Sequence, residues 1–303
     1  MKRKILFFTL LFAGFLSFHR LFAQNYEKEL QENFRPAFMD MGDVETKVTK
    51  LLASEPATNQ QEIQSQLRQR KEAQVNIKRQ QVGKKELSNV ELARRVRLST
   101  VVIGNAYDCG KCHRTHVAPA ATGYIIDEDG IIVTNYHVID SARNRVNGTK
   151  KELFVMTDEG DIFFIKEVLA SSLDDDLAVV RVDTKGKKLK VLPLGHTAQQ
   201  GEDVYVMGHP RHNLYYWSKG IVARNVMGRS VMNRHAVVPL MEITADYGVG
   251  ASGGSVVDKY GNVVGTVSST VSIYADEAAQ RGFQMSIKTT IPVIQLKRLI
   301  KLQ

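Results

Sequence analysis

Three residues of this chain have the types that nucleophilic catalysis by a hydroxyl requires: His137, Asp176 and Ser252. A serine hydroxyl is a poor nucleophile near neutral pH until an imidazole accepts its proton, and a carboxylate then fixes the imidazole tautomer and stabilises the imidazolium. Ser252 lies in a glycine-rich turn, residues 250–254, where backbone N–H groups can face a developing oxyanion. We assign the two oxyanion donors to the N–H groups of Gly250 and Ser252.

Each of these residues also has an ordinary structural interpretation. A histidine between apolar neighbours is commonly a core residue, and an aspartate before a strand commonly caps a turn. Asp174 and Asp175 precede Asp176 directly and compete for its role. The occurrence of all three residue types in the order His, Asp, Ser, each beside a predicted strand or hairpin, favours the catalytic interpretation.

The elements that would position these residues are short β-rich runs separated by turn signals. A first set, which flanks His137 and Asp176, comprises residues 100–103, 123–127, 131–134, 153–157 and 177–182. A second set, which flanks Ser252, comprises residues 204–208, 221–226, 237–244, 255–258 and 262–268. Each set predicts a β-barrel. Residues 291–302 predict a C-terminal helix, with Pro292 in its first turn and Val293, Leu296 and Ile300 on one apolar face.

Further short motifs occur in a fixed order from about Ser99 to the C-terminus. They are ATGYII at 121–126, DLAVV at 176–180, LPLG at 192–195, GHP at 208–210, KGIV at 219–222, GASGG at 250–254 and GFQM at 282–285. Their order and spacing make the chain resemble the HtrA/Deg-type branch of the trypsin-like serine proteases. The resemblance implies an all-β fold of two six-stranded antiparallel β-barrels, with His137 and Asp176 from the first barrel and Ser252 from the second.

The same resemblance implies an activity: a serine endopeptidase that hydrolyses polypeptides through an acyl-enzyme intermediate. Many HtrA-type proteins continue into a PDZ domain, and none is expected here because the sequence ends with the predicted helix. A possible homo-oligomer is left open. The alternative is a catalytically silent protease fold that acts as a sensor or binding module and uses the Cys109/Cys112 cluster for haem, metal or redox chemistry.

Two residues depart from patterns known in trypsin-like enzymes. Ala251 stands where digestive enzymes carry an aspartate that pairs with a new N-terminus, so activation by that ion pair is not expected. Asp246 lies six residues before Ser252, the spacing at which an acidic residue forms the base of an S1 pocket for Arg or Lys. The alternative is that Asp246 bonds local backbone groups and faces away from substrate.

Cys109 and Cys112 are the only cysteines, in the run CGKCH. The exported character of the chain favours a local disulfide or a dithiol. A metal site with His113 and His116 is a second interpretation. The C-x-x-C-H pattern also matches c-type haem attachment, with His113 as the axial ligand. We expect no haem and no other cofactor, and we place the segment in an insert loop between the first two strands.

The N-terminal third differs from the rest in composition. Residues 1–23 predict a secretory signal peptide, with a basic start, an apolar stretch and a cleavage site after Ala23. A periplasmic or secreted protein without obligatory membrane insertion is therefore expected, and the alternative is an uncleaved N-terminal anchor. Residues 24–98 predict a charged, partly solvated helical extension; residues 68–97 contain ten Lys or Arg against three Glu. Residues 99–303 then form the protease domain. The net charge is +9, but no nucleic-acid motif accompanies it.

Overall fold

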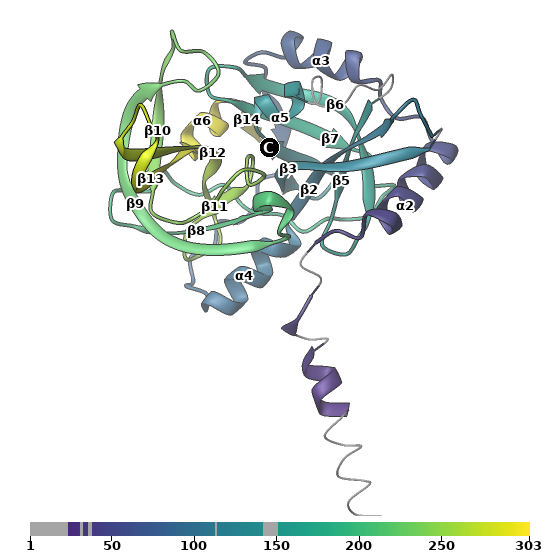
Figure 1. The fold of residues 1–303 in the computed structure, drawn as a ribbon, viewed down its shortest axis with the longest axis horizontal. Coiled ribbons are helices and arrows are strands. Elements are labelled where there is room, and N and C mark those ends of the chain that lie inside the picture. Colours follow the sequence, from purple (N-terminus) through teal and green to yellow (C-terminus); the bar gives the residue numbers. More distant parts are fainter. Residues whose placement is uncertain (1–23, 31–32, 36–37, 113, 142–150) are drawn as a thin grey trace, which may run out of the picture. The chain divides into compact units, whose positions relative to one another are not determined.

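The computed structural model describes residues 24–30, 33–35, 38–112, 114–141 and 151–303, so the predicted signal peptide lies outside the described residues. The chain divides into two units, Met1–Phe38 and Met39–Gln303. In the first unit, residues 24–30 are helical. The second unit contains both β-barrels (Figure 1). No helix among the described residues is long and apolar enough to cross a membrane.

The first barrel is a closed ring of six antiparallel strands in the order β2-β3-β4-β7-β6-β5. Its strands are β2 (Thr100–Asp108), β3 (Thr115–Asp127), β4 (Ile131–Thr134), β5 (Lys151–Met156), β6 (Ile162–Ser172) and β7 (Leu177–Val182). β-Branched and aromatic side chains from these strands fill the interior, as the burial of Ile125, Ile132 and Val180 illustrates. The short helix α5 (Tyr136–Ser141) follows β4 and carries His137.

The second barrel is closed in the order β10-β13-β12-β11-β8-β9. Its strands are β8 (Asp203–Gly208), β9 (Tyr216–Arg229), β10 (Val237–Ile243), β11 (Ser255–Val257), β12 (Val263–Asp276) and β13 (Arg281–Pro292). A one-turn 3₁₀ helix, η1 (Pro210–His212), follows β8. The expected fold class, two six-stranded antiparallel barrels, is confirmed.

Two strands of the barrels were not predicted, β6 and β13. The first carries Lys166 and Glu167 in its middle, and the first five residues of the second are exposed. Neither strand therefore shows the apolar alternation that marks a strand in sequence. Both are fixed instead by pairing with neighbours on each side in the closed barrels.

The segment before the first barrel contains α2 (Met41–Ser54), α3 (Gln60–Gln69), β1 (Val75–Ile77) and α4 (Asn89–Leu98). Each helix buries its apolar stripe: Val44 and Val48 from α2, Ile63 and Leu67 from α3, and Leu92 and Val96 from α4. These side chains join the clusters that contain barrel residues. From Met39 onward, the helices of the segment therefore pack on the barrels along one face and leave much of the other face exposed.

The C-terminal helix is shorter than predicted. α6 spans Val293–Arg298, and Pro292 is its N-cap rather than a residue of its first turn. Ile300 belongs to a strand, β14 (Ile300–Leu302), which pairs in parallel with β1. The helix prediction for residues 299–302 is wrong because this pairing joins segments more than 200 residues apart, which local periodicity cannot reveal.

Candidate active site

His137 is held by Asp176 through two contacts. The backbone N–H of His137 donates to Asp176 Oδ1 at 3.0 Å, and its ring Nδ1 lies 2.8 Å from Oδ2 and 3.0 Å from Oδ1. The Asp176 side chain is 3% exposed and that of His137 is 31% exposed. A carboxylate at Nδ1 favours the tautomer with the proton on that nitrogen, so Nε2 keeps the lone pair that a general base needs.

Asp176 is itself fixed by neighbours on both barrels. It lies in a tight turn before β7, with φ of 53°, and its carbonyl oxygen accepts a hydrogen bond from Asn135 Nδ2 at 3.0 Å. Ser268 of β12 donates its hydroxyl to Asp176 Oδ2 at 3.1 Å. The sequence reasoning missed both partners. Asn135 adjoins the histidine motif, which is a weak signal, whereas nothing in the sequence distinguishes Ser268.

The two neighbouring aspartates face other partners. Asp174 accepts a hydrogen bond from Asn233 Nδ2 at 2.8 Å. Asp175 accepts one from Ser172 Oγ at 2.9 Å and another from Gln295 Nε2. Of the three consecutive carboxylates, only that of Asp176 contacts His137.

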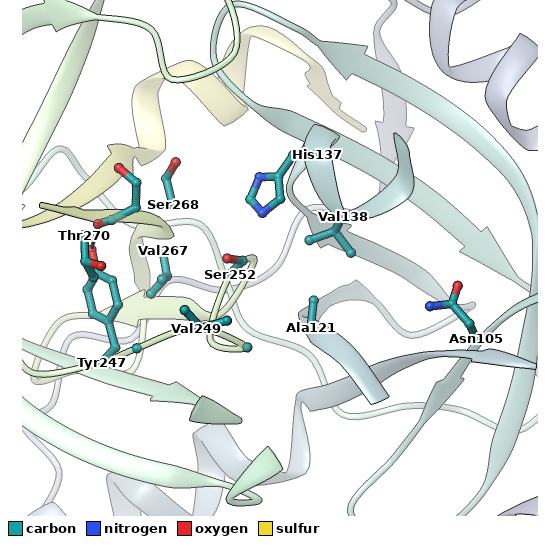
Figure 2. A pocket seen from close by; sticks show the side chains of 13 residues that line it. Asn105, Ala121, His137, Val138, Tyr247, Val249, Ser252, Val267, Ser268 and Thr270 are labelled. Carbon is teal, nitrogen blue, oxygen red and sulfur yellow. Dashed lines mark hydrogen bonds between the residues drawn. The ribbon is translucent and has the colours of Figure 1, made fainter. Parts of the chain in front are cut away.

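Ser252 and His137 lie on the wall of one pocket of about 200 Å³ (Figure 2). The pocket is lined by Asn105, Ala121, His137, Val138, Tyr247, Gly248, Val249, Gly250, Ser252, Val267, Ser268, Ser269 and Thr270. Within the described part of the chain, no hydrogen bond joins Ser252 to His137. Such a contact commonly tightens only when substrate is bound, so the arrangement remains compatible with a nucleophile and its base.

The turn at Ser252 contains two backbone N–H groups without a hydrogen-bond partner among the described residues. Ala251 N–H donates to Gly248 O at 3.0 Å and Gly253 N–H donates to Val267 O at 3.0 Å. The N–H group of Gly250, which precedes Ala251, and that of Ser252, which lies between Ala251 and Gly253, donate to no group that the structure describes. Both residues line the pocket. Two unused N–H groups on the same turn as a serine are the arrangement that an oxyanion hole requires.

Thr122 of β3 connects the first barrel to this turn. Its N–H donates to Ser252 O at 3.0 Å. Its hydroxyl donates to Gly250 O at 2.9 Å and accepts the N–H of His209 at 3.1 Å. A Cβ at Gly253 would lie 2.3 Å from Thr122 O, and Gly253 has φ of 81°, so only glycine fits there. This threonine is a third contributor that sequence reasoning did not identify.

The segment after β8 packs against the other side of the turn. Arg211 N–H donates to Val249 O at 2.7 Å, and a Cβ at Gly250 would lie 2.5 Å from His209 O. The ring of His209 is buried and its Nδ1 accepts the N–H of Tyr215 at 3.0 Å. Burial lowers the pKa of His209 to about 3, so this ring is neutral near neutral pH.

Part of the chain is similar to known proteins. Residues 121–265 match the family model of the trypsin-like peptidase domain. This part of the chain is a trypsin-like peptidase domain, and its relatives include HtrA/Deg-type proteases. Protease Do-like 5, chloroplastic, from Arabidopsis thaliana is 29% identical over 155 residues, which cover 49% of this chain and 47% of that protein.

A probable periplasmic serine endoprotease, DegP-like, from Pseudomonas savastanoi pv. phaseolicola is 33% identical over 146 residues, covering 48% of this chain and 28% of that protein. Among solved structures, the HtrA-type protease AlgW with a decapeptide superposes with a TM-score of 0.54 at 17% identity, over 69% of this chain and 66% of that one. This likeness concerns the fold. The aligned part of this chain thus covers less than half of the length of each of these two relatives.

Asp246 does not line the pocket of the peptidase domain. Its side chain is 77% exposed, and its Oδ1 lies 2.8 Å from Lys288 Nζ. Lys288 also donates to Tyr247 O, so the lysine and the aspartate form a surface pair beside the pocket wall. The hypothesis that Asp246 forms the base of an S1 pocket does not fit this placement, and its partner is a lysine side chain rather than local backbone.

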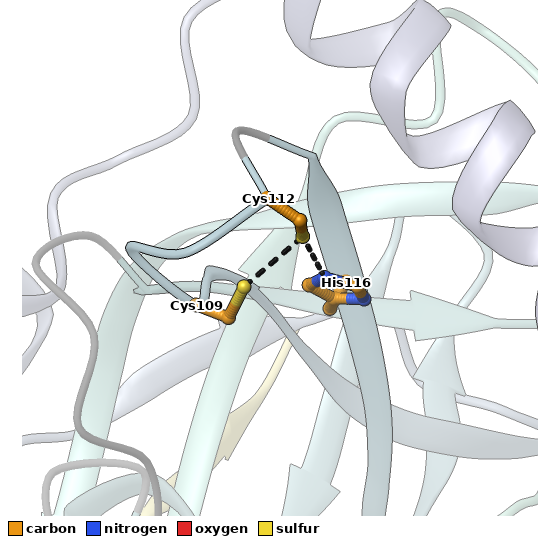
Figure 3. Close-up of side chains that lie close together, drawn as sticks. All are labelled: Cys109, Cys112 and His116. Carbon is orange, nitrogen blue, oxygen red and sulfur yellow. Dashed lines mark hydrogen bonds between the residues drawn. The ribbon is translucent and has the colours of Figure 1, made fainter.

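The two cysteines lie at the tip of the β2–β3 hairpin of the peptidase domain, in the expected insert between the first two strands (Figure 3). Cys109 and Cys112 are free thiols whose sulfur atoms are 3.1 Å apart. His116 joins them, with Nε2 at 2.9 Å from Cys112 Sγ. His113, the other candidate ligand, lies outside the described residues.

Proposed function

We propose that this chain is an exported serine endopeptidase. The observation that carries the proposal is the pocket in which His137, hydrogen-bonded to the buried Asp176, shares a wall with Ser252. The relatives that the comparisons found are named as proteases, which supports the same reaction class.

In the proposed reaction, Ser252 Oγ attacks the scissile carbonyl carbon while His137 Nε2 takes the hydroxyl proton. Asp176 stabilises the imidazolium, and the N–H groups of Gly250 and Ser252 bind the negatively charged oxygen. His137 then returns the proton to the leaving amine, which leaves an ester on Ser252. A water molecule, deprotonated by the same imidazole, hydrolyses that ester.

We further propose that the substrates are polypeptides with uncharged side chains at the bond that is cut. Val249, Val267 and Tyr247 contribute apolar surface to the pocket, and uncharged polar side chains such as Ser269 and Thr270 contribute polar surface. No acidic side chain of the described residues lines the pocket. The superposable AlgW structure contains a decapeptide, which supports a peptide ligand for this fold.

Export is proposed on the sequence of residues 1–23 and on the DegP-like relative, which is named as periplasmic. Expression in a bacterial host, followed by mass measurement of the protein in the periplasmic fraction, tests it. We expect a mature N-terminus at Gln24. A cytoplasmic protein that keeps Met1 would contradict export and leave the catalytic proposal untouched.

Covalent labelling by a fluorophosphonate tests the catalytic proposal, because the probe reacts only with a serine that a base activates. We expect the wild-type protein to be labelled at Ser252 and to hydrolyse an unfolded protein substrate. Ser252→Ala should lose both properties, and His137→Ala should lose nearly as much because the residues act as a unit. A folded wild-type protein that resists the probe and leaves unfolded substrates intact would instead favour a silent protease fold.

A further inference from the structure

The cysteine cluster has a geometry that the proposed proteolysis does not use. One ligand atom from each of Cys109, Cys112 and His116 lies within 4.8 Å of the others (Figure 3). Cys112 is exposed and Cys109 is partly buried, so the three groups open toward solvent. They are brought together by the hairpin itself, since His116 lies on β3 directly across from Tyr107 of β2.

The orientation of His116 is set from the other side of its ring. Its Nδ1 lies 3.3 Å from Oε1 of Glu45, a residue of α2. The same carboxylate oxygen accepts the N–H of Val117 at 3.4 Å. A carboxylate at Nδ1 holds the proton there and leaves Nε2 as the electron-pair donor, and Nε2 is the atom that faces the two sulfurs. Carboxylate, imidazole and metal follow one another in this way in many metal sites.

We propose that Cys109, Cys112 and His116 bind a zinc ion, with Glu45 as the residue that positions the imidazole. Two thiolates and one imidazole suit zinc, and three protein ligands leave one tetrahedral position for water. Binding releases the two thiol protons to solvent. The bound ion would fix the tip of the β2–β3 hairpin to α2, which belongs to the segment before the first barrel.

A disulfide between the same two cysteines is the competing chemistry. It would use the sulfurs alone and would give neither His116 nor Glu45 a role. The zinc site accounts for all four side chains, and this is why we favour it. The site lies outside the catalytic pocket, so the proposal is independent of the proposed proteolysis and can be tested in the Ser252→Ala background.

The experiment is a titration of the reduced, metal-free full-length protein with Co²⁺ and then with Zn²⁺. We expect one Co²⁺ per chain, a thiolate-to-cobalt charge-transfer absorption, and displacement of Co²⁺ by Zn²⁺. Cys112→Ser and His116→Ala should abolish the absorption. Glu45→Gln should keep the charge-transfer band and weaken zinc binding about 10- to 100-fold. Circular dichroism should show that these surface variants remain folded.

A matched control is available on the second barrel. His196 Nε2 lies 3.0 Å from Glu202 Oε2, which makes an exposed histidine–glutamate pair without thiols. Glu202→Gln should leave zinc affinity unchanged. The proposal is overturned if the reduced protein takes up no stoichiometric zinc, if His116→Ala binds zinc as the wild type does, or if protein isolated from the periplasm with zinc present carries a Cys109–Cys112 disulfide.

Discussion

At the scale of single residues, Asp176 shows how one carboxylate can be held in one orientation. It accepts hydrogen bonds from the backbone and ring of His137 and from the hydroxyl of Ser268, and almost no water reaches it. A side chain with several donors and little solvent cannot rotate without losing them, so the imidazole that depends on it stays aligned with the pocket.

Replacement of the Asp176 carboxylate by an amide distinguishes its role from that of the neighbouring aspartates. Asp176→Asn should lower kcat by about 10⁴-fold, because an amide stabilises the wrong imidazole tautomer and cannot stabilise the imidazolium. Asp174→Asn should change kcat only a few-fold, because its carboxylate accepts from Asn233 instead. Steady-state hydrolysis of a peptide substrate by both variants measures the difference. A harmless Asp176→Asn beside a crippling Asp174→Asn would show that the wrong acid was chosen.

His209 makes the stability of the fold depend on pH. Its pKa falls from an ordinary value of 6.5 to about 3 on burial, so the unfolded chain binds a proton more readily than the folded one. This contribution to stability is complete above pH 6.5 and is lost as the pH falls toward 3. Between pH 7 and pH 5, the free energy of unfolding should fall by about 2 kcal/mol from this group alone.

The measurement is urea denaturation at several pH values for the wild type and for His209→Gln. The variant has no group that titrates at this position, so its curve should lack this part of the pH dependence even if its stability is lower throughout. Parallel curves for the two proteins would contradict the assignment.

The residues of the candidate site that could be predicted are those that lie in a recognisable short motif. His137, Asp176 and Ser252 each lie in a short motif, and the structure brings the first two into contact and the third to the same pocket. Ser268, Thr122 and Asn135 were missed because their roles arise from contacts across the fold. Asp246 was misplaced for a related reason, since its spacing to Ser252 says nothing about Lys288, its actual partner.

At the scale of elements, the segment before the first barrel is part of the folded core. Its composition predicted a charged, partly solvated helical extension, and the apolar stripes of its helices pack in clusters with barrel residues. In α3, Ile63 and Leu67 are about 1% and 0% exposed and pack in the cluster of the first barrel. Most barrel strands were predicted from short β-rich runs between turn signals, and strands such as β4 and β7 are buried along almost their whole length. The β1–β14 pair and the strands β6 and β13 depend on neighbours far along the chain.

This interpretation of α3 predicts a large effect from one truncation. Leu67→Ala should lower the free energy of unfolding by about 2 to 5 kcal/mol, because it removes fully buried methyl groups and leaves a cavity. Val90→Ala on α4, where the side chain is 80% exposed, should change it by less than about 0.5 kcal/mol. Chemical denaturation of both variants compares them. If both variants changed the free energy of unfolding by nearly zero, this segment would not be part of the folded core.

At the scale of the whole molecule, the candidate site exists only where two separately closed barrels meet. His137 and Asp176 belong to the first barrel, and Ser252 lies in a turn of the second. The alignment of nucleophile and base therefore depends on how the barrels are joined. Buried hydrogen bonds join them here, among them those of Thr122 with the turn of Ser252, of Ser268 with Asp176, and of the Tyr124 hydroxyl with Thr266 Oγ1 at 2.8 Å.

Thr122 should therefore act as a positioning residue for the oxyanion donors. Thr122→Val keeps the shape of the side chain but removes the hydroxyl that holds Gly250 O and accepts the N–H of His209. We expect kcat to fall about 10- to 100-fold, since small displacements of catalytic groups have effects of this size, and the free energy of unfolding to fall by about 1 to 3 kcal/mol. Thr122→Ser, which restores the hydroxyl, should recover most of kcat.

Tyr124→Phe provides the matched control, because it removes a different buried hydrogen bond between the barrels without touching the turn of Ser252. It should lose stability to a similar extent and keep kcat within a few-fold of wild type. Peptide hydrolysis and denaturation of the three variants decide between a positioning role and a purely structural one. If Thr122→Val and Tyr124→Phe were destabilised alike and both kept wild-type kcat, the join between the barrels at Thr122 would matter for folding alone.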